Sequence, residues 1–173
     1  YVVYAEGIYV GYRYYETRYY DTVYGNGNAS AQTGSSTGNA WKYEDEVAYS
    51  FGYGMSYVDF DESIVPGSLK VDIEARTVSV DVSVTNNGSM PAKYVAQLYV
   101  QSPYTDYDKD VVQINGTSQR RVEKSAVQLL SFEKKEIAAG ATETITVTGD
   151  LKYVASYDKP AVHTDENGEQ LTG

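Results

Sequence analysis

Apolar and polar residues alternate in short runs over the second half of the chain. A period of two is typical of a strand with one buried face. Turn residues separate the runs about every eight to twelve positions, as in a β-sandwich. The apolar positions that carry the pattern are Leu69, Val71, Ile73, Val78, Val80, Val82, Val84, Ile145 and Val147, with the run Tyr94–Val100 between them. We therefore predict a mainly β protein with an immunoglobulin-like β-sandwich over residues 61–173. Within it, 107–124 has no clean period and is expected to leave the sandwich.

Residues 1–24 are also β-like, but both faces of the expected strand are rich in aromatic rings. Ile8, Val10, Tyr12 and Tyr14 would share one face. Apolar character on both sides predicts a strand that is covered on both sides.

A segment of low complexity, residues 25–40, follows this expected strand. Its glycine, serine, asparagine and threonine cannot fill a core, so we expect a flexible loop. Trp41 ends this loop, with Tyr43 close behind. The tryptophan would either anchor the loop or offer a flat platform for a sugar ring. An acidic trio comes next (Glu44, Asp45 and Glu46), and it is more typical of a solvated turn than of a catalytic cluster.

The stretch from Phe51 to Tyr57 alternates large side chains with glycine and serine. In an extended backbone, one face would carry rings and Met55, and the other would be almost bare. Glycine in such a place indicates close approach by another segment, a ring or a ligand. A tight corner packed against a neighbouring domain and direct ligand contact are the two interpretations. We take residues 25–60 together as a loop and an aromatic–glycine connector.

The net charge of −10 and a pI near 4.5 disfavour nucleic acid and anionic membrane surfaces as partners. No apolar run approaches the roughly 20 residues that a membrane-spanning helix needs. The chain contains no cysteine and only His163, which excludes thiol chemistry and a site with several histidines. No cofactor and no metal are expected.

Asp106, Asp108 and Asp110 resemble the start of a calcium loop, but the pattern then fails. A calcium loop of this kind needs glycine at its sixth position and glutamate at its twelfth. Here Val111 and Thr117 stand at these positions, so we expect no specific calcium site.

Tyrosine is unusually frequent, with 19 residues, most of them before residue 58. Its ring and hydroxyl suit both sugar-binding clefts and wet domain interfaces. Trp41, Tyr43, Tyr14 and Tyr15 are the candidates for contact with a sugar substrate. The chain begins without methionine or a secretory signal pattern, and we interpret it as a piece of a longer polypeptide.

Several motifs, in this order along the chain, resemble the C-terminal part of glycoside hydrolase family 3, the β-glucosidase and β-xylosidase family. They are Glu6–Tyr15 (EGIYVGYRYY), Ser50–Tyr57 (SFGYGMSY), Val82–Gly88 (VSVTNNG), Ala96–Pro103 (AQLYVQSP), Phe132–Lys134 (FEK) and Ala139–Gly140. The resemblance implies a fibronectin type III-like domain from about residue 61. It also implies that residues 1–24 are the terminal strand of an α/β sandwich domain.

Members of this family hydrolyse β-glycosides with retention through two carboxylates, about 5–5.5 Å apart in retaining enzymes. The resemblance places both carboxylates on domains outside this chain, so no residue here is expected to be catalytic. Glu6 lies in the terminal-strand motif and receives no catalytic role. The implied partners are the remaining catalytic domains of the parent enzyme and a β-glucoside or oligosaccharide substrate.

One departure from the family concerns the end of the chain. The resemblance implies a closing strand after the region of Tyr153–Asp158, but residues 159–173 are polar and unlike it. A missing strand would leave a sheet edge open to association. We expect the isolated chain to be marginally stable, to pair, for example as a homodimer, or to exist beside the rest of the enzyme. The alternative interpretation is an independent carbohydrate-binding or adhesive β-sandwich.

Overall fold

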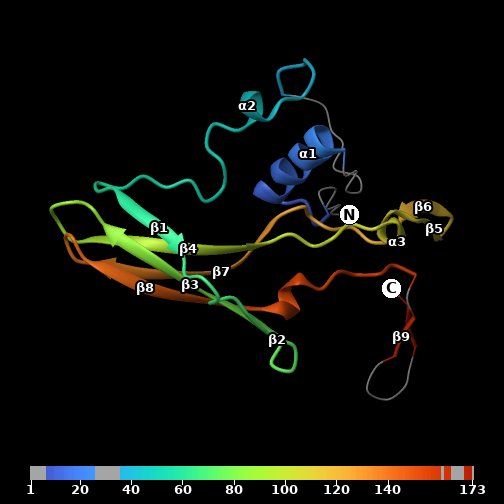
Figure 1. Cartoon of the computed structure of the whole chain (residues 1–173). Coiled ribbons are helices and arrows are strands. Elements are labelled where there is room, and N and C mark those ends of the chain that lie inside the picture. The colour runs from blue at the N-terminus through green and yellow to red at the C-terminus, as the bar shows by residue number, and fades with distance from the viewer. Residues whose placement is uncertain (1–6, 26–35, 161, 165–169, 173) are drawn as a thin grey trace. The chain divides into compact units, whose positions relative to one another are not determined.

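The computed structural model describes residues 7–25, 36–160, 162–164 and 170–172. They fall into two compact units (Figure 1). One unit comprises residues 51–100 and 128–155, and is the sandwich. The other comprises residues 1–50, 101–127 and 156–173, and we call it the aromatic unit.

The sandwich unit consists of six strands and a short 3-10 helix among the described residues. They are β1 (Phe60–Ile64), β2 (Lys70–Asp72), β3 (Thr77–Asn86), β4 (Ala92–Val100), β7 (Gln128–Ile137), β8 (Thr142–Asp150) and η1 (Leu151–Val154). The fold is a mainly β sandwich, as predicted. The alternating valines of β3 and the apolar run in β4 are confirmed as strands.

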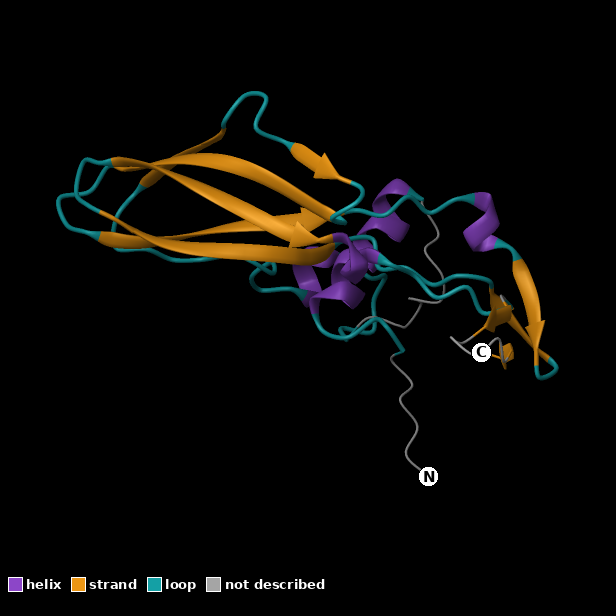
Figure 2. Cartoon of the chain, turned by 90° about the horizontal axis from the view of Figure 1, so that it is seen from below, coloured by secondary structure: helices purple, strands orange, loops and turns teal. Residues whose placement is uncertain are grey.

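The aromatic unit contains the three α-helices found in the described part of the chain, whereas the long strands of Figure 2 belong to the sandwich unit. Its elements are α1 (Tyr12–Tyr24), α2 (Tyr43–Glu46), α3 (Asp106–Lys109), β5 (Val111–Ile114), β6 (Thr117–Arg120), β9 (Val162–Thr164) and β10 (Gln170–Thr172). The predicted departure of 107–124 from the sandwich is confirmed, because this segment belongs to the aromatic unit.

Strand β3 is the centre of the larger sheet of the sandwich. Strand β8 pairs antiparallel with β3 over 77–85 along one edge. Strands β1 and β2 pair with 82–86 and 77–79 of β3, so both must lie along its other edge. The smaller sheet pairs β4 with β7 antiparallel, with a register shift between Leu98 and Tyr99.

The core lies between these two sheets. Val84, Ile137 and Val147 are almost completely buried, together with Ala96 and Ile145. The rings of Phe60 and Tyr94 meet edge to face at a centroid distance of 5.2 Å and extend the core toward β1. Contact of this kind adds to the burial of apolar area that stabilises the fold.

Asn86 is a fully buried polar residue at the end of β3. Its Nδ2 donates to the carbonyl oxygens of Met90 and Ile137, both at 2.9 Å, and its Oδ1 accepts from the Gly88 amide at 2.8 Å. This side chain joins the turn after β3 to the end of β7. The predicted turn at Asn87-Gly88 is therefore organised by the buried residue that precedes it.

The predicted strand in residues 1–24 is wrong over Tyr12–Tyr24, which forms helix α1. The helix lies between Gly11 and Gly25, both at positive φ, and Gly25 ends it in the left-handed conformation. Thr17 is completely buried, and its Oγ1 accepts the Ala126 amide at 2.9 Å. The alternation of tyrosines suggested a strand, but tertiary contacts on a ring-rich helix override this local preference. Residues 1–6 lie outside the described residues.

Of the expected loop at 25–40, the structure describes Gly25 and residues 36–40, and the latter form a turn and bends. At the other end, β9 and β10 pair antiparallel with each other. Among the described residues they do not join the sandwich sheets.

We expect Asn86→Ala to lower the free energy of unfolding of the sandwich by about 3 kcal/mol, because it leaves buried backbone groups without partners. The neighbouring exposed Asn87 offers a matched control, and Asn87→Ala should cost less than about 0.5 kcal/mol. Urea denaturation followed by circular dichroism measures both. Equal costs for the two variants would contradict the role given to Asn86.

Candidate functional site

The predicted sugar-contact residues Trp41 and Tyr43 lie together in the aromatic unit. Their ring centroids are 6.3 Å apart in an edge-to-face arrangement. Arg18 of α1 lies over the Trp41 ring, with its guanidinium carbon 5.2 Å from the centroid. A guanidinium at this distance interacts favourably with the ring face. Helix α1 therefore fixes Trp41, which is half-exposed.

Tyr43 is fixed by α1 as well. Its hydroxyl donates to Glu16 Oε1 at 2.5 Å, and its ring meets the Tyr19 ring at 5.3 Å. Burial and the Glu16 carboxylate together raise the pKa of Tyr43 well above its ordinary value. The hydroxyl therefore stays protonated at neutral pH and acts as a hydrogen-bond donor.

The other two predicted residues, Tyr14 and Tyr15, form a second ring pair at 5.1 Å. Tyr14 and Tyr104 are both partly buried and pack against Tyr9, which is buried. Burial raises the pKa of Tyr9, and Glu123 adds to the shift. The four predicted residues thus form two ring pairs, and Tyr14 belongs to the packing around Tyr9.

Glu16, Arg18 and Tyr19 are residues of this site that the sequence reasoning missed. They lie close together on one turn of α1. A strand, which was predicted here, would not place them together. The signal that could have found them is the spacing of polar residues within 16–22, together with the two flanking glycines.

The acidic trio after Tyr43 lies in the short helix α2, and its three side chains have different surroundings. Glu46 Oε1 accepts the Ser36 amide at 2.8 Å, which fastens the end of the loop. Glu44 and Asp45 are exposed. This agrees with the expected solvated turn.

The three aspartates that resemble a calcium loop have different partners. Asp108 is buried, pairs with Lys124 at 2.8 Å and accepts the Thr105 amide and hydroxyl at 2.7 and 2.9 Å. Asp110 pairs with Arg121 at 3.1 Å. Within the described residues, no group of three or more His, Cys, Asp or Glu side chains is placed to hold a metal ion.

The connector begins with a close approach at Gly52, as predicted. Its φ is +85°, and a Cβ built there would lie 2.3 Å from the Tyr99 hydroxyl and 2.8 Å from Gln97 Oε1. The Gln97 amide donates to the Gly52 carbonyl at 3.2 Å. Gly54 has open space around it, so only the first of the two glycines is required for packing.

The large side chains of the connector are exposed on the described part of the chain. The exposed fractions are 45% for Phe51, 61% for Tyr53, 88% for Met55 and 99% for Tyr57. A contiguous apolar segment of this kind is typical of a surface that contacts another protein or a ligand.

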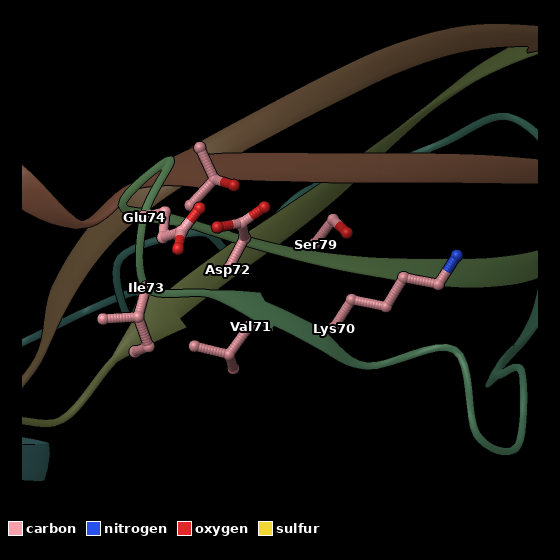
Figure 3. Close-up of a pocket in the computed structure, with 7 residues that line it drawn as sticks. Lys70, Val71, Asp72, Ile73, Glu74 and Ser79 are labelled. Carbon is pink, nitrogen blue, oxygen red and sulfur yellow. The ribbon is translucent and has the colours of Figure 1, made fainter.

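A pocket of about 480 Å³ lies beside the β2–β3 pairing (Figure 3). Its lining is Lys70, Val71, Asp72, Ile73, Glu74, Thr77 and Ser79. Figure 3 shows Asp72 on one side of the strand and Val71 and Ile73 on the other. Asp72 Oδ1 accepts the Ala75 amide at 2.8 Å and so shapes the turn. The lining contains no aromatic residue, so this pocket lacks the stacking surface of a sugar site.

Among the described residues, no helix has the length and the apolar character to cross a bilayer.

Known proteins similar to this chain include several β-glucosidases. The chain is 32% identical over 157 residues to thermostable β-glucosidase B of Acetivibrio thermocellus, covering 91% of this chain and 16% of that protein. It is 30% identical over 160 residues to a β-glucosidase of Rhizobium radiobacter, covering 92% of this chain and 14% of that protein. The chain thus spans less than a fifth of the length of either relative. No family model matches the chain.

Solved structures of β-glucosidases are also similar to this chain. The β-glucosidase of Paenibacillus barengoltzii matches 91% of this chain and 13% of its own, with 28% identity and a TM-score of 0.60. The glycoside hydrolase family 3 β-glucosidase of Bifidobacterium adolescentis matches 91% of this chain and 17% of its own, with 25% identity and a TM-score of 0.57. The chain is similar to a part of glycoside hydrolase family 3 β-glucosidases. The matched part of these enzymes is rich in β-strands, as the sequence of this chain predicts.

We expect Gly52→Ala to destabilise the sandwich by about 1–2 kcal/mol, because alanine is strained at this φ and displaces Tyr99. Gly54→Ala is the matched control and should be neutral or slightly stabilising. Thermal unfolding of the two variants measures the difference. If Gly54→Ala costs as much as Gly52→Ala, the close approach is not the reason for the glycine.

Asp108→Asn should lower the stability of the aromatic unit by about 1–2 kcal/mol at pH 7. Burial opposes ionisation, but Lys124 and Thr105 outweigh it and hold the pKa of Asp108 below its ordinary value. Its stabilising effect is therefore complete above the ordinary carboxyl pKa and is lost as the pH falls through the lower folded pKa. The gap to the wild type should narrow in urea titrations as the pH falls below the ordinary carboxyl pKa. Asp106→Asn, at an exposed neighbour, should have little effect at either pH, and a similar loss there would contradict this account.

Proposed function

We propose that this chain is a non-catalytic part of a family 3 retaining β-glycosidase that hydrolyses terminal β-linked glucose. In this role it braces the catalytic domains and borders the substrate cleft. The parent is a hydrolase of the β-glucosidase kind, and the chain alone is inactive. Two relatives with at least 30% identity over more than nine tenths of the chain support the assignment of the parent.

The exposed connector carries the proposed bracing role. Met55 and Tyr57 are almost fully exposed in the chain alone, and Phe51 and Tyr53 about half or more. Such an apolar segment, held at one end by the close approach at Gly52, is suited to burial against another domain.

The described carboxylates support the proposed inactivity of the chain alone. Retaining hydrolysis needs one carboxylate as nucleophile and one as acid and base, facing the same anomeric carbon. Asp108 and Asp110 are each paired with a cation, and Glu16 accepts the Tyr43 hydroxyl. Asp72 and Glu74 line a pocket without rings.

The ring pair of Trp41 and Tyr43 supports a contribution to the border of the substrate cleft. Trp41 keeps part of its surface exposed while Arg18 holds one face. Tyr43 offers a ring and a protonated hydroxyl. The same observation favours the second candidate function, an independent carbohydrate-binding module.

A hydrolysis assay with an aryl β-glucoside distinguishes these functions. We expect no turnover by the chain alone, and turnover when it is joined to the remaining domains of the parent. In the parent, replacing both Met55 and Tyr57 by serine should reduce thermal stability and activity together, whereas Tyr157→Ser, at an exposed site elsewhere, should change neither. Turnover by the chain alone would overturn the proposal. Tight oligosaccharide binding by the isolated chain, lost in Trp41→Ala, would favour the second function.

A further inference from the structure

The aromatic unit contains a continuous chain of rings that begins at its tryptophan. The ring centroids of Trp41 and Tyr43 are 6.3 Å apart, and those of Tyr43 and Tyr19 are 5.3 Å apart. Tyr19 lies 6.0 Å from Tyr24 and 6.0 Å from Tyr20, and these last two rings are 5.1 Å apart. Every step is thus a contact between neighbouring rings. We call these residues the ring chain.

The two ends of the ring chain have different surroundings. Trp41 is half-exposed, and the guanidinium of Arg18 lies over its ring. Tyr24 is the last residue of α1, and 61% of its surface is exposed. The ring chain therefore leads from a ring held beneath a cation to a ring that faces the solvent.

Indole and phenol rings are side chains that lose one electron readily, as thiols do. This chain has no cysteine, and Trp41 is its only tryptophan. A one-electron oxidant that reaches the chain therefore has one indole to attack and no thiol. The ring contacts then decide where the oxidising equivalent, the missing electron, moves next.

The charges beside the first two rings favour movement away from Trp41. The Arg18 guanidinium carbon is 5.2 Å from the Trp41 centroid, and a positive charge at this distance opposes the loss of an electron. The charge beside Tyr43 has the opposite sign, because the Tyr43 hydroxyl donates to Glu16 Oε1 at 2.5 Å. An oxidised state is therefore more stable at Tyr43 than at Trp41, as far as these charges decide it.

Glu16 also provides a place for the proton of Tyr43. A phenol that loses an electron becomes strongly acidic, so oxidation of tyrosine near neutral pH releases the hydroxyl proton as well. The Glu16 carboxylate already accepts this proton in a hydrogen bond. A base in direct hydrogen-bond contact can take up the proton without any movement of the rings.

We propose that the ring chain carries an oxidising equivalent from Trp41 to the surface at Tyr24. An oxygen-centred radical takes one electron from Trp41, whose indole proton goes to water. Tyr43 then gives an electron to the indolyl radical, which regains a proton from water, while the Tyr43 proton passes to Glu16. Tyr19 gives the next electron and releases its proton to water, and Tyr43 recovers its proton from Glu16. Tyr24 reduces Tyr19 in the same way.

The last step takes place in solution. A soluble one-electron reductant of the ascorbate class transfers one hydrogen atom to the Tyr24 phenoxyl radical and restores the tyrosine. Trp41 is thus spared from permanent oxidation at the expense of the reductant. This inference does not depend on the proposed function, because no step involves a sugar.

The test is pulse radiolysis of the full 173-residue chain with the azidyl radical, which oxidises tryptophan faster than tyrosine. Since Trp41 is the only tryptophan, the absorption of the indolyl radical reports on one site. We expect this absorption to decay as that of the phenoxyl radical rises, at a rate that is independent of protein concentration. Tyr43→Phe keeps the ring but removes the oxidisable hydroxyl, and should slow this transfer at least tenfold. Tyr153→Phe, at an exposed tyrosine of the sandwich unit, is the control and should leave the rate unchanged.

Glu16→Gln tests the role of the proton acceptor. The glutamine oxygen still accepts the Tyr43 hydroxyl, so the ring stays in place, but the amide does not take up the proton. We expect a slower transfer in this variant, and a slower transfer of the wild type in D₂O than in H₂O. A merely structural role of Glu16 would leave both rates unchanged.

Near-ultraviolet circular dichroism checks the ring packing of the variants. If the packing is disturbed, the wild-type chain decides the matter through mass spectrometry of spin-trap adducts formed after oxidation. We expect these adducts on Tyr24 or Tyr20.

Three results would overturn the proposal. They are an equal transfer rate in the wild type and in a correctly packed Tyr43→Phe variant, a transfer rate that rises in proportion to protein concentration, and spin-trap adducts of the wild type that remain on Trp41.

Discussion

The sandwich unit depends on covering the apolar face of β3. Its alternating valines are the middle of the core, and every other strand of the unit either pairs with β3 or packs across it. Burial of this face is the main favourable term in the folding of the unit. Asn86 ends the strand with three hydrogen bonds and so fixes the point where the covered face stops. The sheet of β4 and β7 covers only part of the face, which explains why Ile64 and Val71 remain exposed.

The aromatic unit is held together in a different way. Its buried hydrophobic residues are few among those described (Tyr9, Val122 and Ala126), and polar contacts join its distant segments. Thr17 binds the Ala126 amide, and Asp108 binds Lys124. Rings on α1 pack edge to face with one another and with Tyr43. A unit with so small an apolar core gains little stability from burial alone. This agrees with its proposed place against further domains of a larger enzyme.

The sequence predicted β3, β4 and β8 of the sandwich well, because each has a partly buried face and period two follows directly from that. It predicted no strand at β1 and no clear period at β7. It could not predict that β4 pairs with β7, because the segment between them leaves the sandwich and pairing over such a distance has no local signal. The hairpin of β5 and β6 was missed although it has a local signal: Asn115 and Gly116 both have positive φ, as a tight hairpin turn requires. Helix α1 was missed because its many tyrosines have a high propensity for strands.

The candidate site was predicted only in part for the same reason. Trp41 and Tyr43 were found from composition, and the structure brings them together. Their supports on α1 could not be found while that segment was taken as a strand. Tyr14 was a candidate for contact with a sugar, and in the structure it packs on the buried Tyr9.

The central claim is that this chain is a module whose exposed connector is covered by other domains of the proposed parent enzyme. Hydrogen–deuterium exchange of backbone amides, measured in the chain alone and in the parent enzyme, tests this most directly. The account predicts that β3 is protected in both, while residues 51–57 exchange fast in the chain alone and slowly in the parent. Unchanged exchange of the connector between the two proteins would contradict it.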